Sequence, residues 1–477
     1  MQLPTTYIPF ITATYPPNLA TQILSGLQTP PEVSVRLNGR KHPAEYPLLS
    51  SLFQDEVPWL PMSQKAYYLS GRPPFSLDPL WHSGAYYVQD ASSMIVGYIV
   101  EQLQLPCNIP VRALDLCAAP GGKSQLLRDF LPKDSLLVCN EIELRRARIL
   151  HENMLKWCAT QDTLVTSAEP QALAEALGEY FDIILVDAPC SGEGLFRKDE
   201  QAVQMWSREN VSFCAQRQWQ ILEAADRLLQ QDGFLLYSTC TLNKEENEAI
   251  VLRMIREKGY RVVSMVLPQT KCPHGIYESE EVGWHFFPHL VKGEGLYICV
   301  LQKGEGAERR SESQPLIKKK NKSGSAREDV WVSLTVSHPL METVEWLVPE
   351  MREDLYVYNN ELYLISTSMQ ACIRQLLARK IYLLSYGVPL AACKGKKVQP
   401  LWPLAMSSDL LVSDTFLKKV DLTYPEALEY LRCQALVTNG GESGYVLMCY
   451  QGVALGFANR LSSRLNNLFP KEYRLRS

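Results

Sequence analysis

The sequence lacks the patterns by which metal sites, disulfide frameworks and membrane spans are usually identified. Its 13 cysteines include no C-x-x-C pair and no cysteine–histidine cluster at zinc spacing. We therefore expect no metal site, and a reducing compartment. The apolar runs are too short for a membrane helix. The first segment, MQLPTTYIPFITATYPP, has neither the basic stretch nor the long apolar run of a signal peptide. These absences predict a cytoplasmic protein with no membrane partner.

An excess of charge of either sign is also missing. The chain has 48 lysines and arginines against 52 acidic residues, a net charge of −4. A nucleic acid would therefore have to bind a local basic surface. No internal repeat is evident, and 477 residues are enough for about two to four domains.

A central segment, residues 106–302, alternates short apolar strands with amphipathic helices. The strands are bounded by turn residues and are apolar throughout, as expected when both faces of a parallel sheet are buried. The segment therefore predicts a doubly wound α/β domain. The expected strands are 112–117, 135–140, 162–166, 181–187 and 233–239, and the expected helices are 144–157, 171–180 and 208–231.

The rest of the chain divides by composition. Residues 1–105 mix short helices, strands and loops rich in proline and aromatic residues. Residues 303–328 are polar and rich in lysine, arginine, serine and glycine, which is typical of a flexible basic linker. We expect a first C-terminal domain over 329–384 and a β-rich domain over 385–477.

The turn LDLCAAPGGKSQ follows an expected strand and opens a helix, so its free backbone N–H groups can hold polar ligand atoms. A phosphate loop would need glycine where Cys117 stands, and the dinucleotide pattern G-x-G-x-x-G is absent. S-adenosylmethionine needs a small-residue turn and acids instead. Glu141 and Asp187 end the following strands. The turn and the two acids together favour a methyltransferase.

Two cysteines, Cys190 and Cys240, each follow an apolar strand on a polar loop. Buried cysteines usually serve packing, but both of these are expected at the carboxyl edge of the sheet, where ligands bind. A thiolate that adds to C6 of a pyrimidine makes C5 nucleophilic, which is covalent catalysis. The start of a helix, with Asn243 and Glu246 as a capping box, is expected to lower the pKa of Cys240.

Four motifs resemble those of the Nol/Nop/Sun family of RNA cytosine-C5 methyltransferases: LDLCAAPGGK, VDAPCSGEGLFRKD, YSTCTLNKEENE and PHLVKGEGLY. The similarity covers about residues 30–302. The final GFANRLSSRLNNLFPKEYR is similar to the PUA-like domain of the family's bacterial small-subunit ribosomal RNA methyltransferase F branch. The resemblance implies a Rossmann-like S-adenosylmethionine-dependent methyltransferase sheet. It also implies an N-terminal α+β RNA-binding region and a C-terminal β-rich PUA-like RNA-binding region.

The resemblance also assigns roles by position. It implies that Cys240 is the covalent nucleophile, that Cys190 assists release of the methylated base, and that Asp187 meets the cytosine. Glu169 stands where the family usually has aspartate near the adenine. The implied S-adenosylmethionine contacts are Cys117, Ala118, Ala119, Pro120, Gly121, Gly122, Lys123, Glu141, Glu169 and Asp187.

An enzyme that acts on a stacked base must flip it out or bind a single strand, so basic side chains should hold the RNA. The candidates are Arg36, Arg197, Lys198, Arg460 and Arg464. The expected function is methylation of cytosine C5 in small-subunit ribosomal RNA, by a monomer acting on the RNA or on the small subunit. Two alternatives stay open: a transfer RNA cytosine-C5 methyltransferase, and a non-catalytic RNA-binding factor for ribosome assembly.

Overall fold

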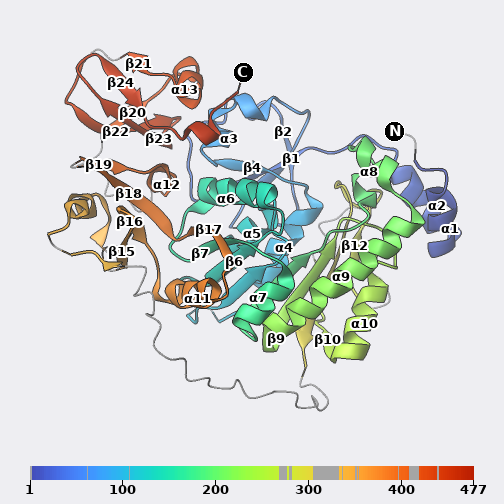
Figure 1. The fold of residues 1–477 in the computed structure, drawn as a ribbon. Helices are drawn as coiled ribbons and strands as arrows, with labels where there is room; N and C mark the ends of the chain where they lie inside the picture. The colour runs from blue at the N-terminus through green and yellow to red at the C-terminus, as the bar shows by residue number, and fades with distance from the viewer. Residues whose placement is uncertain are drawn as a thin grey trace, which may run out of the picture.

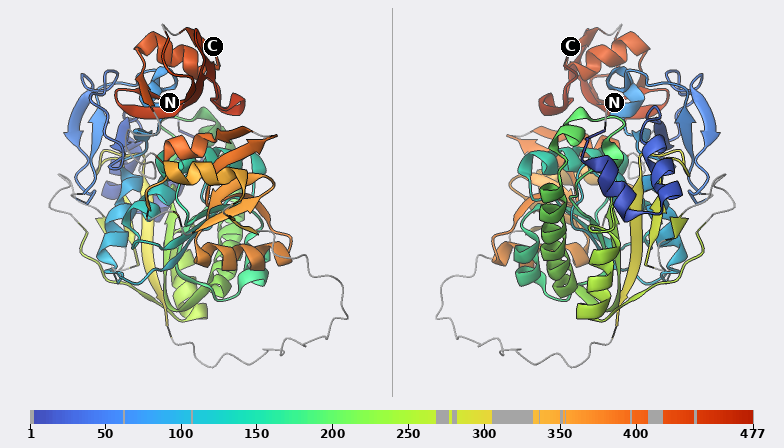
Figure 2. Two further views of the ribbon diagram at one scale, coloured as in Figure 1. Left: turned by 90° about the vertical axis from the view of Figure 1, so that its left-hand side faces the viewer. Right: turned by 90° about the vertical axis from the view of Figure 1, so that its right-hand side faces the viewer.

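In the residues that it describes, the computed structural model has four β-sheets, with the largest at its centre (Figure 1). The last domain, coloured red, lies beside the N-terminal region, coloured blue (Figure 2). Two hydrogen bonds join these parts, from Ala44 N–H to the Gln451 carbonyl at 3.0 Å and from the Tyr424 hydroxyl to the Leu77 carbonyl at 3.2 Å. The structure describes residues 3–61, 63–106, 108–267, 277–278, 282–304, 332–335, 337–349, 352, 354–395, 397–407, 418–437 and 440–476.

The N-terminal region is a helical pair followed by a small antiparallel sheet in the order β2-β3-β1-β4. Tyr7 of the helical pair packs edge-on against Phe196 and Trp206, which joins the pair to the central domain. The elements are α1 (Tyr7–Thr14), α2 (Pro17–Gly26), β1 (Ser34–Leu37), β2 (Phe53–Glu56), β3 (Ala66–Leu69), α3 (Pro79–His82) and β4 (Tyr86–Val88).

The central sheet confirms the predicted doubly wound domain. Five parallel strands stand in the order β9-β8-β5-β6-β7, and antiparallel strands continue the sheet beyond β9. The parallel strands are β5 (Arg112–Asp115), β6 (Leu136–Asn140), β7 (Thr163–Ser167), β8 (Phe181–Asp187) and β9 (Leu229–Thr239). The antiparallel strands are β10 (Tyr260–Val262), β11 (Tyr277–Glu278), β12 (Trp284–Phe286) and β13 (Leu296–Lys303).

Helices bury both faces of this sheet, and the alternation of side chains in β8 shows how. Ile183 and Leu185 join the core that contains α4, α5 and α6, whereas Ile184 and Val186 join the core that contains α7, α9 and α10. Because successive strand residues face opposite sides, a continuous apolar run satisfies both cores. The helices are α4 (Ile95–Gln102), α5 (Gly122–Phe130), α6 (Leu144–Cys158), α7 (Pro170–Leu177), α8 (Glu200–Met205), α9 (Arg208–Leu228) and α10 (Glu248–Lys258).

Three predicted helix ends are wrong. Helix α7 ends at Leu177 rather than at residue 180, because Gly178 follows it with a φ of +61°. Helix α9 ends at Leu228, because Leu229 pairs with Phe181 and begins β9. Asn243 does not cap α10, which begins only at Glu248. Its side-chain oxygen instead accepts the N–H of Glu246 at 2.9 Å and closes a turn before the helix.

The C-terminal part holds two five-stranded sheets, and one of its strands, β17, pairs antiparallel with β7 of the central sheet. The first sheet comprises β14 (Val332–Ser333), β15 (Leu355–Tyr358), β16 (Glu361–Leu364), β18 (Val388–Lys394) and β19 (Lys397–Pro400). Near it lie α11 (Thr367–Ala378), β17 (Tyr382–Tyr386) and α12 (Trp402–Met406). The second comprises β20 (Lys418–Asp421), β21 (Leu436–Val437), β22 (Gly444–Tyr450), β23 (Val453–Arg460) and β24 (Arg464–Asn467), with α13 (Tyr424–Leu431).

The domain boundary predicted between residues 384 and 385 is therefore wrong. It falls inside β17, and the first C-terminal sheet takes strands from both sides of it. The predicted linker begins too early, because Lys303 ends β13 and is buried. Residues 305–328 of the linker lie outside the described residues. No helix in the described ranges is long and apolar enough to cross a membrane.

Candidate active site

Cys190 and Cys240 lie on neighbouring loops at the carboxyl edge of the central sheet. Cys190 follows β8 and Cys240 follows β9, and these strands pair in parallel with Asp187 opposite Ser238. The two Sγ atoms are 3.3 Å apart, and both residues are partly exposed. The two cysteines thus form one site, open to a ligand.

Asp187 is held beside these thiols by two hydrogen bonds. Lys123, in the first turn of α5, donates from Nζ to Asp187 Oδ2 at 2.8 Å. The Ser238 hydroxyl donates to Asp187 Oδ1 at 2.8 Å. The carboxylate is therefore fixed in one orientation, and each oxygen keeps a lone pair for a ligand.

The two thiols differ in their affinity for a proton. The hydrogen bond from Cys190 lowers the pKa of Cys240, and the charge of Lys123 acts in the same direction, against burial and Asp187. The same hydrogen bond, with burial, raises the pKa of Cys190 well above its ordinary value. Burial lowers the pKa of Lys123, but the Asp187 carboxylate outweighs it and raises that pKa overall. Of the two thiols, the site therefore favours Cys240 as the one that loses its proton, and it favours the charged form of Lys123. Because α10 starts at Glu248, neighbouring side chains rather than a helix end produce this effect.

Two buried glutamates hold the two cysteine loops together. Glu246 accepts the N–H of Ser191 at 3.0 Å and the Asn243 amide at 2.8 Å. Glu193 accepts the same Asn243 amide at 2.9 Å and the N–H of Leu242 at 2.9 Å. Sequence analysis missed this network. The only sequence signal was the unusual number of acids and amides in two turn-forming segments.

A backbone contact fixes Cys240 itself. Gly194 donates its N–H to the carbonyl oxygen of Cys240 at 2.9 Å. A Cβ atom at position 194 would lie 2.8 Å from that oxygen, which is too close for a side chain. The chain therefore needs glycine here to bring the Cys190 loop against the Cys240 loop.

Two cavities meet at these residues. The first, of about 290 Å³, extends over β6 and β7 and is lined by Glu141, Glu169 and Arg217, among others. The second, of about 380 Å³, lies toward the N-terminal region and is lined by Tyr87 and Lys198, among others. The residues that line both are Cys117, Ala119, Asp187, Leu195 and Cys240.

The predicted cofactor turn forms the wall between the cavities. Gly121 precedes α5 with a φ of +114°, a backbone conformation that favours glycine. The first N–H groups of α5 have no partner within the helix and are free to bind a ligand. Glu141 is buried below the first cavity, accepts the N–H of Glu143 at 3.0 Å and forms an ion pair with Arg146 at 3.2 Å.

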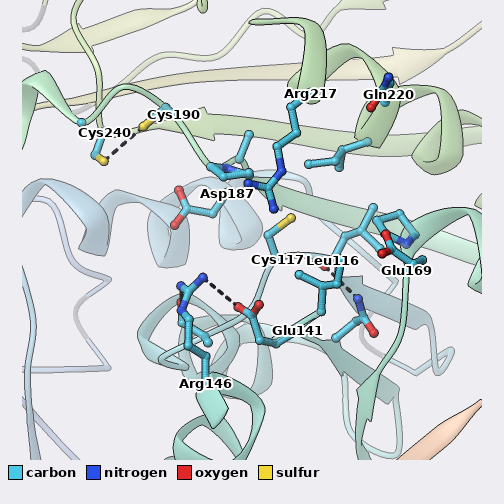
Figure 3. A pocket seen from close by; sticks show the side chains of 18 of the residues that line it. Leu116, Cys117, Glu141, Arg146, Glu169, Asp187, Cys190, Arg217, Gln220 and Cys240 are labelled. Atoms are coloured by element: carbon cyan, nitrogen blue, oxygen red, sulfur yellow. Dashed lines mark hydrogen bonds and ion pairs between the residues drawn. The ribbon is translucent and has the colours of Figure 1, made fainter. Parts of the chain in front are cut away.

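Glu169 also lines the first cavity, from the position before α7. Figure 3 shows it on the side away from Cys190 and Cys240, with Glu141 on the floor of the pocket. The acids of the first cavity can accept hydrogen bonds from hydroxyl and amino groups of a ligand. The backbone N–H groups at the start of α5 can donate to its polar acceptors. S-adenosylmethionine has these groups, so the residues present fit it.

Two of the five predicted RNA contacts are wrong, because their side chains are buried. Arg36 is 0% exposed and forms an ion pair with Asp129 at 2.8 Å. Arg197 is 7% exposed and pairs with Glu294 at 3.3 Å. Both side chains join the N-terminal region to the central domain and leave no guanidinium face for a nucleic acid.

The other three predicted contacts are accessible. Lys198 is exposed and lines the second cavity. Arg464 is exposed on β24, and Arg460 at the end of β23 is partly exposed. Elsewhere in the described ranges, no three histidine, cysteine or acidic side chains are grouped to hold a metal ion.

Three family models match the chain, in the order of its domains. Residues 3–91 match the N-terminal domain of 16S rRNA methyltransferase RsmF. Residues 106–302 match 16S rRNA methyltransferase RsmB/F, and residues 417–475 match the methyltransferase RsmF PUA domain. The last match begins well after the predicted start at residue 385, in agreement with the sheet boundaries.

Curated relatives and solved structures are similar along most of the chain. The ribosomal RNA small subunit methyltransferase F of Enterobacter sp. (strain 638) is 30% identical over 401 residues, which cover 82% of this chain and 78% of the relative. The protein of that name from Escherichia coli O81 (strain ED1a) is 30% identical over 395 residues, with the same coverage.

Two solved structures share the fold. A methyltransferase homolog protein from Pyrococcus horikoshii has a TM-score of 0.50 and 24% identity, and covers 61% of this chain and 93% of its own. NSun6 from Pyrococcus horikoshii, solved with SFG, has a TM-score of 0.51 and 18% identity, and covers 64% and 99%. At this identity the likeness shows the fold alone.

Proposed function

Because the chain belongs to the RsmB/F family of 16S ribosomal RNA methyltransferases, we propose that it methylates C5 of a cytosine in small-subunit ribosomal RNA. The proposed methyl donor is S-adenosylmethionine, and Cys240 forms a transient covalent bond to the base. The observation that carries this proposal is the meeting of two cavities at Cys240 and Asp187, with a second thiol 3.3 Å from the first.

The two cavities divide the reactants. The first cavity, with Glu141 and Glu169, receives the methyl donor, and the second receives the flipped base. When bound, S-adenosylmethionine supplies an electrophilic methyl group on its sulfonium. Because the same residues line both cavities, the sulfonium of the methyl donor and the base are both bound next to them. The reacting atoms are therefore held close together.

Cys240 starts the reaction. Its thiolate adds to C6 and forms the Sγ–C6 bond, while the π electrons of the C5=C6 double bond shift to C4–C5 and those of the C4=N3 double bond move onto N3. Lys123, whose ammonium is 2.8 Å from Asp187, stabilises the negative charge that reaches N3, and Asp187 accepts a hydrogen bond from the exocyclic amino group of the cytosine. C5 becomes nucleophilic and would form a bond to the methyl carbon, while the electron pair of the broken S–CH3 bond would stay on the donor's sulfur, which leaves as a neutral thioether.

Cys190 completes the reaction. Once Cys240 is a thioether, the hydrogen bond to its thiolate and its negative charge, which both raise the pKa of Cys190, are lost, so Cys190 can lose its proton to solvent. Its thiolate then accepts the C5 proton. The electrons of the C–H bond restore the C5=C6 double bond, the Sγ–C6 bond breaks, and Cys240 leaves as a thiolate.

RNA is held, in this proposal, by Lys198 at the mouth of the second cavity and by Arg460 and Arg464 of the last domain. The last domain lies against the N-terminal region, so both can contact one folded RNA. An enzyme of ribosomal RNA acts where ribosomes are assembled, and we propose a monomer in the cytoplasm.

Bisulfite sequencing of small-subunit ribosomal RNA and transfer RNA, each incubated with the protein and S-adenosylmethionine, tests this function. We expect new 5-methylcytosine in the ribosomal RNA, and none with Cys240→Ala. Methylation confined to transfer RNA would replace the proposed substrate. Absence of methylation in naked ribosomal RNA, isolated small subunits and transfer RNA alike would overturn the proposal.

A further inference from the structure

Two cations stand among the described residues that line the first cavity, Arg146 and Arg217, and of these only Arg146 has a carboxylate partner in the described ranges. Arg146 pairs with Glu141 at 3.2 Å and also donates to the Ala119 carbonyl. Arg217, on α9, forms no ion pair or hydrogen bond with any residue in the described ranges. Figure 3 shows Arg217 reaching from α9 into the cavity, toward Cys117. Burial raises the pKa of the Cys117 thiol, and Arg217 is the cation that opposes this rise.

The base of this side chain is fixed in place. Its neighbour Gln218 is fully buried and donates to the Pro189 carbonyl at 3.1 Å and to Glu246 at 2.7 Å. Helix α9 is thus attached to the Cys190 loop beside the cavity. The Arg217 side chain therefore starts from a rigid position next to the reacting groups.

The orientation of the methyl donor in the cavity determines which of its groups lies next to Arg217. Methyl transfer requires the sulfonium near Cys240, at the end of the cavity that both cavities share. The ribose and adenine then lie toward Glu141 and Glu169, and the amino acid tail lies near Cys117 and Asp187. That tail ends in a carboxylate, and Asp187 would repel it.

We propose that Arg217 binds the carboxylate of the methyl donor's amino acid tail. This inference rests on the proposed function, since it takes S-adenosylmethionine as the ligand of the first cavity. The planar guanidinium can donate two parallel hydrogen bonds to a carboxylate. With Asp187 already joined to Lys123, Arg217 supplies the missing counter-charge at this end.

Calorimetry with two ligands tests the assignment without turnover. S-adenosylhomocysteine carries the carboxylate, and its decarboxylated analogue lacks only that group. We expect Arg217→Ala to weaken S-adenosylhomocysteine binding roughly 10- to 100-fold, the range for one charge-assisted interaction. The affinity for the decarboxylated analogue should change by less than about twofold, within the scatter of such measurements.

Two further variants serve as controls. Arg217→Lys keeps the charge without the planar fork and should recover part of the lost affinity. Arg227→Ala removes an exposed arginine of the same helix that lines neither cavity, and should bind both ligands as the unmodified protein does. Thermal unfolding of each variant shows whether it is folded.

The outcomes separate the possible roles. Equal losses for both ligands would mean that Arg217 contacts the adenosine part, and unchanged binding of both would mean that it contacts no part of the donor; either result overturns the assignment. If the unmodified protein does not bind S-adenosylhomocysteine, the proposed cofactor fails and the Arg217 assignment fails with it.

Discussion

The Sγ atoms of Cys190 and Cys240 lie 3.3 Å apart, within reach of one S–H···S hydrogen bond. In this hydrogen bond one sulfur donates the proton and the other accepts it, so the two thiols differ in pKa. Lys123 favours the charge on Cys240, because its ammonium group acts on that thiol. In the proposed mechanism, Cys240 is therefore the sulfur that attacks, and Cys190 keeps its proton until Cys240 has reacted.

Removal of Cys190 should raise the pKa of Cys240, because the hydrogen bond that lowers it is lost. The rate of iodoacetamide alkylation at Cys240, followed by mass spectrometry against pH, measures this. We expect the profile of Cys190→Ala to move to higher pH than that of the unmodified protein, and Cys190→Ser to lie between them. A profile that moves to lower pH in Cys190→Ala would contradict the assignment.

Gly194→Ala should lower methylation strongly while the protein stays folded. The new methyl group would lie 2.8 Å from the carbonyl oxygens of Cys240 and Glu294, so the Cys240 loop must move. A misplacement of about 1 Å can cost about 100-fold in rate. Gly71→Ala is the matched control, since a Cβ there meets nothing within 4 Å. Full activity of Gly194→Ala would show that the contact does not position Cys240.

The buried Glu193 should make stability depend on pH. Burial raises its pKa from 4.5 to about 7. Since the folded protein holds this proton more tightly than the unfolded chain, the contribution is fully present below pH 4.5 and is lost as the pH rises to about 7. Its size is roughly 3 kcal/mol. Urea unfolding between pH 4.5 and 8 should show a shallower decline for Glu193→Gln, and an equally steep decline would refute the assignment.

Arg36 and Lys198 should behave in opposite ways, although the sequence presents both as basic candidates for RNA binding. Arg36→Ala removes a fully buried guanidinium that pairs with Asp129 and donates to Gln89 and Gln125, and should cost about 3 kcal/mol or more in free energy of unfolding. Lys198→Ala should change that free energy by less than about 0.5 kcal/mol. It should instead weaken RNA binding and reduce its salt dependence by about one ion. Filter binding at several salt concentrations tests the second expectation, and an unchanged salt slope would contradict it.

The sequence was sufficient to predict the central sheet and to place Asp187 and Cys190 at its carboxyl edge. Strands such as FDIILVD are recognisable because both faces of a parallel sheet are buried, and Asp187 and Cys190 follow from the place where that strand ends. The partners of polar side chains were not predictable, because hydrophobic periodicity carries no information about them. Arg36 lies on a short strand, and its type alone suggests a surface position. Its Cζ atom instead lies 4.1 Å from the centroid of the Trp157 ring, and its guanidinium pairs with Asp129.

The pairing of strands that are far apart in the sequence was also not predictable. Nothing in the sequence of β17 (Tyr382–Tyr386) indicates that its partner is β7 of the central sheet. The Glu193 and Glu246 network depends on two loops that only the sheet register brings together. Both features can be recognised only in the folded structure.

Trapping of a covalent RNA–protein adduct tests the central claim most directly. Cys190→Ala, incubated with small-subunit ribosomal RNA and S-adenosylmethionine, should form a complex that survives denaturing electrophoresis, since Cys240 attacks and release fails. Cys240→Ala should form none, and the double variant should form none. A stable adduct with Cys240→Ala, or efficient methylation by it, would contradict the division of roles between the two thiols.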